Sequence, residues 1–301
     1  MPGPKIAVFG VPTAAGGRNP SVADAPLRLR EAGLLEALRA AGPRVVNLSD
    51  LSLFPFREDP EHPKARNAEV VACAVRAAAD EMTRALAEGF TLVLGGDCTI
   101  VAGVAAGAGL YLGQPPGIIF IDADADLNTP ATTPSGFLHG MALALALGQG
   151  PPEVVAAAGG GAPVLPDHVA LVGFRALDPG EKERIGALSL ALPATAARKL
   201  GMRTAAALAL EAVENGDGPV VVHMDVDVID PAEMPAKPQA VPGPGLSFDE
   251  TSDLVAALVA SPRVVALELC EYAPVHDPGL VTGRRLVELL ARAVGRRFRS
   301  S

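Results

Sequence analysis

Uninterrupted apolar segments constrain the fold of this chain more than any other feature of its sequence. A strand with one face in water alternates apolar and polar residues, whereas a strand buried on both faces is apolar throughout. The segments without alternation are KIAVFGVP, TLVLGG, GIIFI, VALVGF, PVVVHM and VVALEL, which begin at Lys5, Thr91, Gly117, Val169, Pro219 and Val264. Because both faces must be covered, we expect a three-layer α/β/α fold with a mostly parallel sheet of about eight strands.

Segments with a helical spacing of apolar residues lie between these strands. We expect helices over residues 26–41, 67–88, 196–215, 249–260 and 281–297, and a further short strand over residues 44–48. Cys73 is expected to pack on the inner face of the second helix. Residues 148–163 are rich in glycine and are interpreted either as a surface loop or as a helix flanked by turns. Because we find no internal repeat and no linker, residues 1–301 are predicted to form a single domain.

The charge and the cysteine content exclude several classes of protein. The net charge of -9 comes without a basic patch, so we expect no nucleic-acid partner. The apolar run near the N-terminus is too short for a signal peptide. The uncharged stretch 99–121 contains glycines and the pair Pro115–Pro116, so we expect buried core there and no membrane segment. The 3 cysteines form no pair by spacing, which is typical of a reducing compartment and predicts a cytoplasmic location.

Acidic residues follow the apolar strands at the points where these strands end. They are Asp97, Asp122, Asp124, Asp126, Asp225, Asp227, Asp230 and Glu271, and Cys98 accompanies them. The carboxyl ends of parallel strands lie along one edge of a sheet, where sites form in such folds. Every second side chain of an extended segment points the same way, so the aspartates of DADAD share one side. Carboxylates this close repel one another unless a cation lies between them.

Each of these clusters also has a simpler interpretation. An isolated DxDxD is usually a solvated turn or a helix cap, and a lone cysteine after two glycines is usually a small buried side chain. A calcium loop of the EF-hand type is excluded, because Leu127 stands where that loop needs glycine and no glutamate follows at its twelfth position. Taken together, the acids at successive strand ends favour a cation site.

In their order and spacing, these motifs resemble the ureohydrolase family, which includes arginases and agmatinases. The motifs are GGDCT at 95–99, DADAD at 122–126, SGFLHGM at 135–141, DVDVIDP at 225–231 and EYAP at 271–274. The segment APLRLREAGLLEAL at 25–38 also looks like an N-terminal helix of this family. The resemblance covers most of the chain and implies an arginase-like fold. Relatives are commonly trimers or hexamers, so it also implies a homo-oligomer.

The segment NTPATTPSGFLHG, residues 128–140, is similar to the arginase branch of the family rather than to agmatinases. The resemblance implies a guanidino α-amino acid as substrate, L-arginine or a modified arginine such as Nω-hydroxyarginine, with release of urea or a urea derivative. Asn128 and Ser135 would hold the α-carboxylate, and Asp178 in GFRALDPGE would pair with the α-ammonium. Glu181, which ends this motif, is counted with the substrate-binding residues, and Glu271 would anchor the guanidinium.

The mechanism that the resemblance implies is hydrolysis assisted by two Mn²⁺ ions, with one ion or another divalent metal as alternatives. The implied metal ligands are Cys98, Asp122, Asp124, Asp126, Asp225 and Asp227, of which Asp122 and Asp225 would bridge the ions. His139 matches the proton shuttle of the family, a task that suits an imidazole near neutral pH. Asp126 is counted with His139 and Glu271 among the catalytic residues.

Two ligand positions depart from the family, which has histidine where this chain has Cys98 and Asp124. Five carboxylates and a thiolate carry more negative charge than four carboxylates and two imidazoles, so we expect bound metals to be weaker Lewis acids. Thiolate also favours Zn²⁺ or Fe²⁺ over Mn²⁺. Two alternatives therefore stay open: a weak or inactive paralogue with a binding or regulatory role, and a hydrolase of another amidine such as a formimino amino acid. The remaining histidines, His62, His168, His223 and His276, match no motif and are expected to be structural.

Overall fold

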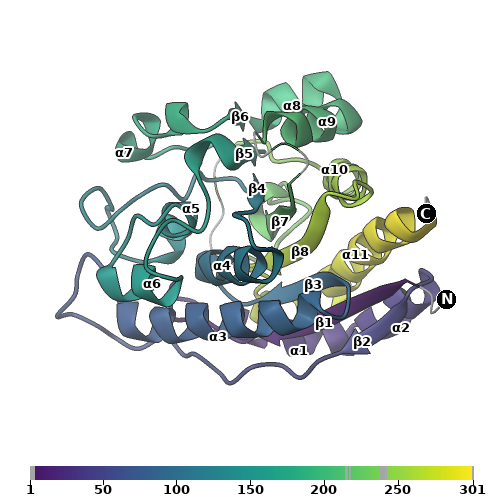
Figure 1. The fold of residues 1–301 in the computed structure, drawn as a ribbon, viewed down its shortest axis with the longest axis horizontal. Coiled ribbons are helices and arrows are strands. Elements are labelled where there is room, and N and C mark those ends of the chain that lie inside the picture. The colour runs from purple at the N-terminus through teal and green to yellow at the C-terminus, as the bar shows by residue number, and fades with distance from the viewer. Residues whose placement is uncertain (1–3, 214–215, 217, 238–240, 242, 300–301) are drawn as a thin grey trace.

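One sheet of parallel strands organises this protein (Figure 1). The computed structural model describes residues 4–213, 216, 218–237, 241 and 243–299. The 8-stranded sheet has the order β2-β1-β3-β8-β7-β4-β5-β6. The strands are β1 Lys5–Val11, β2 Arg44–Asn47, β3 Phe90–Gly95, β4 Gly117–Ile121, β5 Val169–Val172, β6 Leu190–Leu192, β7 Val220–Asp225 and β8 Val264–Cys270. All neighbouring strands are parallel, which confirms the predicted α/β class and sheet type.

Helices cover both faces of the sheet. The helices are α1 Ala25–Glu31, α2 Leu34–Ala40, α3 Ala68–Leu86, α4 Val101–Leu112, α5 Ala142–Ala146, α6 Pro152–Ala157, α7 Pro179–Lys182, α8 Ala194–Leu200, α9 Met202–Ala212, α10 Phe248–Val259 and α11 Val281–Arg299. Helices α3, α4 and α5 pack on one face, and α1, α2 and α8 to α11 pack on the other. In β4, Ile119 and Ile121 contact the second layer while Ile118 and Phe120 contact the first, which explains why the strand sequences do not alternate.

Two predicted helices are each broken in two by a glycine. Gly33 has a φ of 96° and separates α1 from α2, and Gly201 has a φ of 81° and separates α8 from α9. Both angles lie in the left-handed region, which glycine adopts without the penalty that a Cβ imposes. The spacing of apolar residues continues across these breaks, so periodicity alone predicts one helix in each case. The helix predicted over residues 196–215 ends at residues 214–215, which lie outside the described residues.

Three smaller expectations can be compared with the structure. Cys73 is exposed, so its predicted packing inside α3 is wrong; the buried face of that helix runs through Val71, Ala74 and Val75 instead. Residues 148–163 contain α6 between turns, as the second interpretation had it. Strand β6 is not among the predicted strands, because its 3 residues are too few to form a recognisable apolar run.

The uncharged stretch 99–121 forms helix α4, a turn at the proline pair, and strand β4. Its helical part is thus shorter than the apolar run, and it packs in the core beside α3 and against the sheet. Among the residues that the structure describes, no helix combines the length and the hydropathy needed to cross a bilayer.

The strand order places the acidic segments next to one another. Strands β3, β8, β7 and β4 are consecutive in the sheet although they are far apart in the sequence. Each is followed directly by one of the acidic motifs, so four strand ends deliver their polar side chains to one stretch of the carboxyl edge.

The close packing of α4 on α3 gives a stability prediction. A Cβ at Gly107 would lie 2.3 Å from the carbonyl oxygen of Ala79. We expect Gly107→Ala to lower the free energy of unfolding by about 1–3 kcal/mol, although alanine is the better helix former. In the control Gly109→Ala, the new Cβ meets no atom closer than 3.4 Å, so stability should stay the same or rise. Urea denaturation of both variants measures this, and equal effects would contradict the packing argument.

Candidate active site

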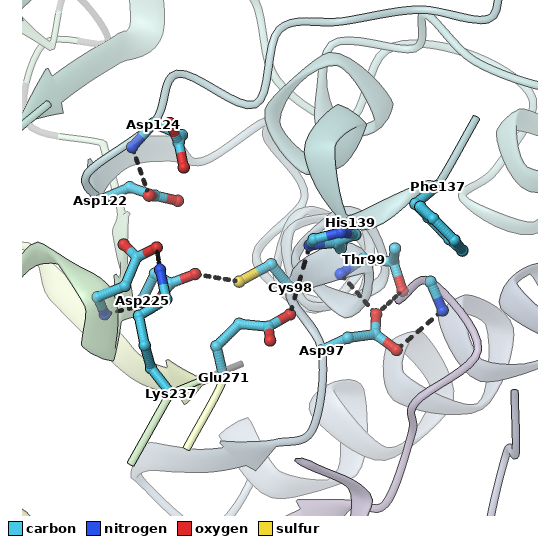
Figure 2. Close-up of polar contacts among 12 residues, drawn as sticks. Asp97, Cys98, Thr99, Asp122, Asp124, Phe137, His139, Asp225, Lys237 and Glu271 are labelled. Atoms are coloured by element: carbon cyan, nitrogen blue, oxygen red, sulfur yellow. Dashed lines mark hydrogen bonds and ion pairs between the residues drawn. The ribbon is translucent and has the colours of Figure 1, made fainter. Parts of the chain in front are cut away.

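A cavity of about 390 Å³ opens at the carboxyl ends of β4, β7 and β8. The predicted site residues that line it are Asp122, Asp124, Asp126, Asn128, Ser135, His139, Asp178, Glu181, Asp225, Asp227 and Glu271. Cys98 is 1% exposed and is not part of the lining; it lies behind the carboxylates, with its Sγ donating to Asp225 Oδ2 at 3.3 Å. Segments from most of the chain therefore meet in one place (Figure 2).

Turns at the ends of β4 and β7 fix the aspartates. Asp122 Oδ1 accepts a hydrogen bond from the Asp124 backbone N–H at 2.8 Å, and Asp225 Oδ1 accepts one from the Asp227 N–H at 2.7 Å. Asp227 Oδ1 in turn accepts from the Ala123 N–H at 3.1 Å, which ties the two turns together. One carboxylate oxygen of Asp122, of Asp225 and of Asp227 is thus held by backbone. The other oxygen of Asp122 has no partner among the described residues, whereas those of Asp225 and Asp227 contact Cys98 and Lys237.

Several sets of donor atoms are close enough to share a cation. One oxygen each from Asp122, Asp124 and Asp227 lie within 4.8 Å of one another, and so do Cys98 Sγ and single oxygens of Asp225 and Glu271. Asp126 is in neither set; it lines the cavity beside them with a left-handed φ of 51°. The structure therefore brings together the predicted ligands, with Asp126 at the margin of the cluster.

Burial and mutual repulsion oppose ionisation of these groups. Desolvation, followed by the charges of neighbouring carboxylates, raises the pKa of Asp122 and of Asp126 well above the usual range. Desolvation raises the pKa of Asp124 to about 6, and burial raises the pKa of the Cys98 thiol. A cation among them reverses this preference, because opposite charge favours the ionised forms.

The residues fit a divalent metal ion. Asp122 Oδ2 is buried and has no hydrogen-bond partner among the described residues, which is costly unless a cation is bound there. Carboxylate oxygens are suitable ligands for Mn²⁺ or Mg²⁺, and the Cys98 sulfur suits a softer ion such as Zn²⁺ or Fe²⁺.

The segment after β4 joins the segment before α7 at the outer part of the cavity. Asn128 Nδ2 donates to Asp178 Oδ2 at 2.8 Å. Glu181 accepts from the Leu127 N–H at 2.9 Å and from the Asp178 N–H at 2.8 Å, one with each carboxylate oxygen. In this structure Glu181 therefore positions the loops that carry Asn128 and Asp178. Ser135 is exposed at the cavity mouth, and its Oγ accepts from the Phe137 N–H at 3.3 Å.

His139 lines the cavity at the start of a 3-10 helix that spans His139–Met141. Its backbone N–H donates to the Gly16 carbonyl at 3.0 Å, and its Nδ1 is 3.9 Å from Glu271 Oε1 (Figure 2). Burial lowers the pKa of His139, and the negative charges of Asp97 and Asp225 oppose this shift more weakly. The lowered pKa favours a neutral imidazole that can accept a proton.

Two of the acids that follow strands have structural roles. Asp97 accepts from the Thr13 hydroxyl at 3.0 Å and from the Gly16 N–H at 3.0 Å, which holds the loop after β1 against the site. Asp230 accepts from the Ala232 N–H at 3.0 Å and from the Gly245 N–H at 2.9 Å, which closes the loop after β7.

Comparison with known proteins decides the family. The family model of the arginase family matches residues 4–295. The chain belongs to the arginase family. It is 30% identical to an arginase of Bacillus caldovelox over 297 residues, which covers 97% of this chain and 99% of the relative, and 31% identical to an arginase of Bacillus subtilis over 297 residues. The crystal structure of arginase from Bacillus cereus matches with a TM-score of 0.87 at 31% identity, covering 97% of this chain and 98% of that one.

Lys237 is a site residue of this arginase-family chain that the sequence analysis missed. It lines the cavity, its ammonium pairs with Asp227 Oδ2, and its side chain is 8% exposed. The Ala273 N–H donates to the Ala236 carbonyl at 2.8 Å, which fastens the neighbouring residue to the segment after β8. Its positive charge lowers the pKa of Asp124 and Asp225 against the larger effect of burial. The cluster therefore holds a cation of its own, which the expected charge balance did not include.

His223 is a second residue that the sequence analysis placed outside the site. It lies in β7, fully buried, and one of its ring nitrogens is within 4.8 Å of Cys98 Sγ and of an Asp122 oxygen. The other histidines expected to be structural are not in the cavity lining, and His62 and His276 are exposed. A signal for His223 was present, since a histidine inside an apolar strand two residues before a ligand motif points to the same face as that motif.

The position of Lys237 leads to a prediction about metal affinity. The Lys237→Met variant lacks the positive charge that competes with a metal ion for Asp227. We expect the Kd for Mn²⁺ to fall at least about tenfold, because like charges a few ångströms apart repel by several kcal/mol at an effective dielectric constant of about 20. Isothermal titration calorimetry measures this. The control Lys199→Met, exposed on α8, should leave the Kd unchanged, and weaker binding in Lys237→Met would refute the competition.

Proposed function

We propose that this protein is a metal-dependent hydrolase of a guanidino α-amino acid, L-arginine or a modified arginine such as Nω-hydroxyarginine, which releases urea or a urea derivative. The observation that carries the proposal is the cavity itself, which combines clustered carboxylates with groups suited to an amino acid at its outer part. We place the enzyme in arginine metabolism in the cytoplasm. We also propose a homo-oligomer, a trimer or a hexamer, which light scattering of the purified protein tests.

Asp122 and Asp225 would contribute ligand oxygens to both halves of the metal site in this proposal. Cys98 and Asp126 would complete one half of the site, and Asp124 and Asp227 the other. Two Mn²⁺ ions are proposed, with one ion or a softer divalent metal as the alternative that the Cys98 thiol favours. When bound, such ions supply Lewis-acid polarisation and an acidified water molecule.

The protein's own residues would bind and orient the substrate. Asp178 offers a carboxylate to the α-ammonium, and Asn128 and Ser135 offer neutral donors to the α-carboxylate. Glu271 would bind the guanidinium, since a carboxylate and a guanidinium form paired hydrogen bonds. The left-handed φ of 65° at Glu271 supports this role, because strained backbone in a non-glycine residue is typical of sites where a side chain must be aimed.

His139 would move the proton that the reaction requires. Hydrolysis of the guanidinium C–N bond leaves an amine that must be protonated as it departs. A neutral His139 can take up a proton at the cavity wall and deliver it to that amine, and its position near Glu271 places it beside the proposed guanidinium site.

A second candidate function follows from Cys98, Asp124 and Lys237, each of which changes the charge of the metal cluster. A weak or inactive paralogue with a binding role is therefore the main alternative, and a hydrolase of another amidine is the third. The Mn²⁺-loaded and Zn²⁺-loaded protein should be assayed with L-arginine, Nω-hydroxy-L-arginine, agmatine and N-formimino-L-glutamate. Release of urea from L-arginine or of hydroxyurea from Nω-hydroxy-L-arginine supports the proposal, and release of urea from agmatine alone contradicts the α-amino acid substrate. Turnover of the formimino compound alone supports the third function, and no turnover of any compound supports the second.

Replacement of His139 tests its proposed role in catalysis. We expect His139→Asn to lower kcat by about a hundredfold, the usual scale for general acid–base catalysis, because an asparagine amide does not take up and release protons near neutral pH. The metal content should not change, since His139 is not a proposed ligand. Steady-state kinetics and elemental analysis measure the two quantities. The exposed His276→Asn is the control, and a kcat in His139→Asn equal to that of the parent would remove His139 from the mechanism.

Replacement of Asp178 tests recognition of the α-ammonium. Asp178→Asn preserves the size of the side chain but not its charge. We expect KM for L-arginine to rise about ten- to a hundredfold with kcat little changed, since a hydrogen bond to a charged group contributes about 1.5–3 kcal/mol. A guanidino acid without the α-amino group should be affected much less. An equal loss for both compounds would show that Asp178 acts on loop structure rather than on the ammonium.

A further inference from the structure

A buried polar cluster lies directly behind the carboxylates of the cavity. His223 of β7, Glu268 and Cys270 of β8 are 0% exposed, and Cys98 beside them is 1% exposed. Their neighbours are apolar residues of the core between the sheet and helices α3 and α4. Placing four ionisable side chains in such surroundings is unfavourable unless each has a partner.

The orientation of the His223 ring is fixed from two directions. Its Nδ1 lies 3.1 Å from Glu268 Oε1, an oxygen that also accepts a hydrogen bond from Cys270 Sγ at 3.1 Å. Its face stacks on Phe120, with a distance of 4.2 Å between the ring centroids. The tautomer that suits a carboxylate at Glu268, which only accepts, has its proton on Nδ1 and its lone pair on Nε2.

Nε2 of His223 has no hydrogen-bond partner among the residues that the structure describes, although it is buried. Since Nδ1 is engaged by Glu268, Nε2 is the nitrogen available to Cys98 Sγ and the Asp122 oxygen, with which a ring nitrogen of His223 forms a set of atoms within 4.8 Å. Asp122 Oδ2 also lacks a partner, and Cys98 Sγ contacts Asp225 Oδ2 at 3.3 Å. A nitrogen of His223, the Cys98 sulfur and an Asp122 oxygen thus form one set of donors, and Asp225 adjoins this set through its contact with Cys98.

We propose that His223 is a metal ligand through Nε2, and that it completes with Cys98, Asp122 and Asp225 a four-donor site for a Zn²⁺-like ion. The inference rests on the proposed function, since it concerns the Cys98 half of the same metal site. Ligating histidines characteristically donate their second ring nitrogen to a carboxylate, which is the arrangement of His223 and Glu268. The combination of thiolate, imidazole and carboxylates is typical of zinc sites.

In this assignment, His223 supplies the imidazole ligand that the family has at position 98. The imidazole comes from strand β7 behind the site, and the smaller cysteine leaves room for it. Cys98, Asp122 and Asp225 carry three negative charges when ionised, one more than the charge of a divalent ion. The selectivity of this half of the site shifts from Mn²⁺ toward Zn²⁺, Fe²⁺ or Co²⁺.

The test uses the full chain stripped of metal and loaded with sub-stoichiometric Zn²⁺, so that the tightest site fills first. X-ray absorption at the zinc edge should show one sulfur and one imidazole in the first shell. His223→Asn keeps a side-chain N–H where Nδ1 donates to Glu268 but has no equivalent of Nε2. In that variant the imidazole signal should disappear, the sulfur signal should remain, and the Kd for Zn²⁺ should rise at least about ten- to a hundredfold.

Matched variants separate the ligand role from a structural one. Cys98→Ser should lose the sulfur signal and keep the imidazole, and His276→Asn should behave as the parent. Glu268→Gln, which loosens His223 without removing it, should weaken Zn²⁺ binding by about tenfold while the imidazole remains visible. The proposal is overturned if zinc in the parent chain shows no imidazole, or if His223→Asn binds Zn²⁺ as the parent does. If His223→Asn fails to fold, the spectrum of the parent chain and the Zn²⁺ affinity of Glu268→Gln still test whether His223 is a metal ligand.

These measurements need no substrate, so the proposed function and the proposed role of His223 can be refuted independently. Zinc bound by His223 in a protein that hydrolyses no guanidino compound would refute the proposed function alone. Hydrolysis of L-arginine by a protein whose metal shows no imidazole ligand would refute this inference alone.

Discussion

Repulsion among carboxylates at the carboxyl edge of the sheet is the constraint on which the rest of this site depends. The order of β3, β8, β7 and β4 brings the acidic motifs together, and burial then removes the water that would screen them. Two features offset this repulsion. Backbone N–H groups donate to one oxygen of several aspartates, and Lys237 supplies a positive charge. Asp122 Oδ2, which has no partner among the described residues, is left for a cation. A bound metal ion would therefore also stabilise this edge of the sheet.

The fold and most of the cavity lining were predictable from the sequence because both depend on local signals. Apolar strands without alternation predict a covered parallel sheet, and motifs at strand ends need only the rule that such ends share an edge. Gly33 and Gly201 break helices through their backbone angles, which the spacing of apolar residues does not reveal. The exposure of Cys73 depends on which face of α3 meets the sheet, and only tertiary packing decides that.

The contacts that Lys237 and His223 make were not predictable from the sequence for a different reason. Lys237 reaches the cluster because Ala273 fastens its loop to the end of β8, a contact between segments that no motif links. His223 meets Glu268 because β7 and β8 pair in register, and it meets Phe120 because β4 pairs with β7 on the other side. Strand order and register are properties of the folded sheet, so a single sequence gives no direct signal for either contact.

The proximity of Cys98 and the His223 ring also has an evolutionary consequence. Both side chains are buried, and they offer ligand atoms within 4.8 Å of each other, so we expect a larger imidazole at position 98 to crowd His223 at a packing cost of about 1–3 kcal/mol. A return to the histidine of the family at position 98 is therefore unfavourable while His223 is present, and loss of His223 leaves its space empty while Cys98 is present. Positions 98 and 223 are epistatic, and a lineage can move between the two arrangements only through an intermediate that is either overpacked or hollow at its metal centre.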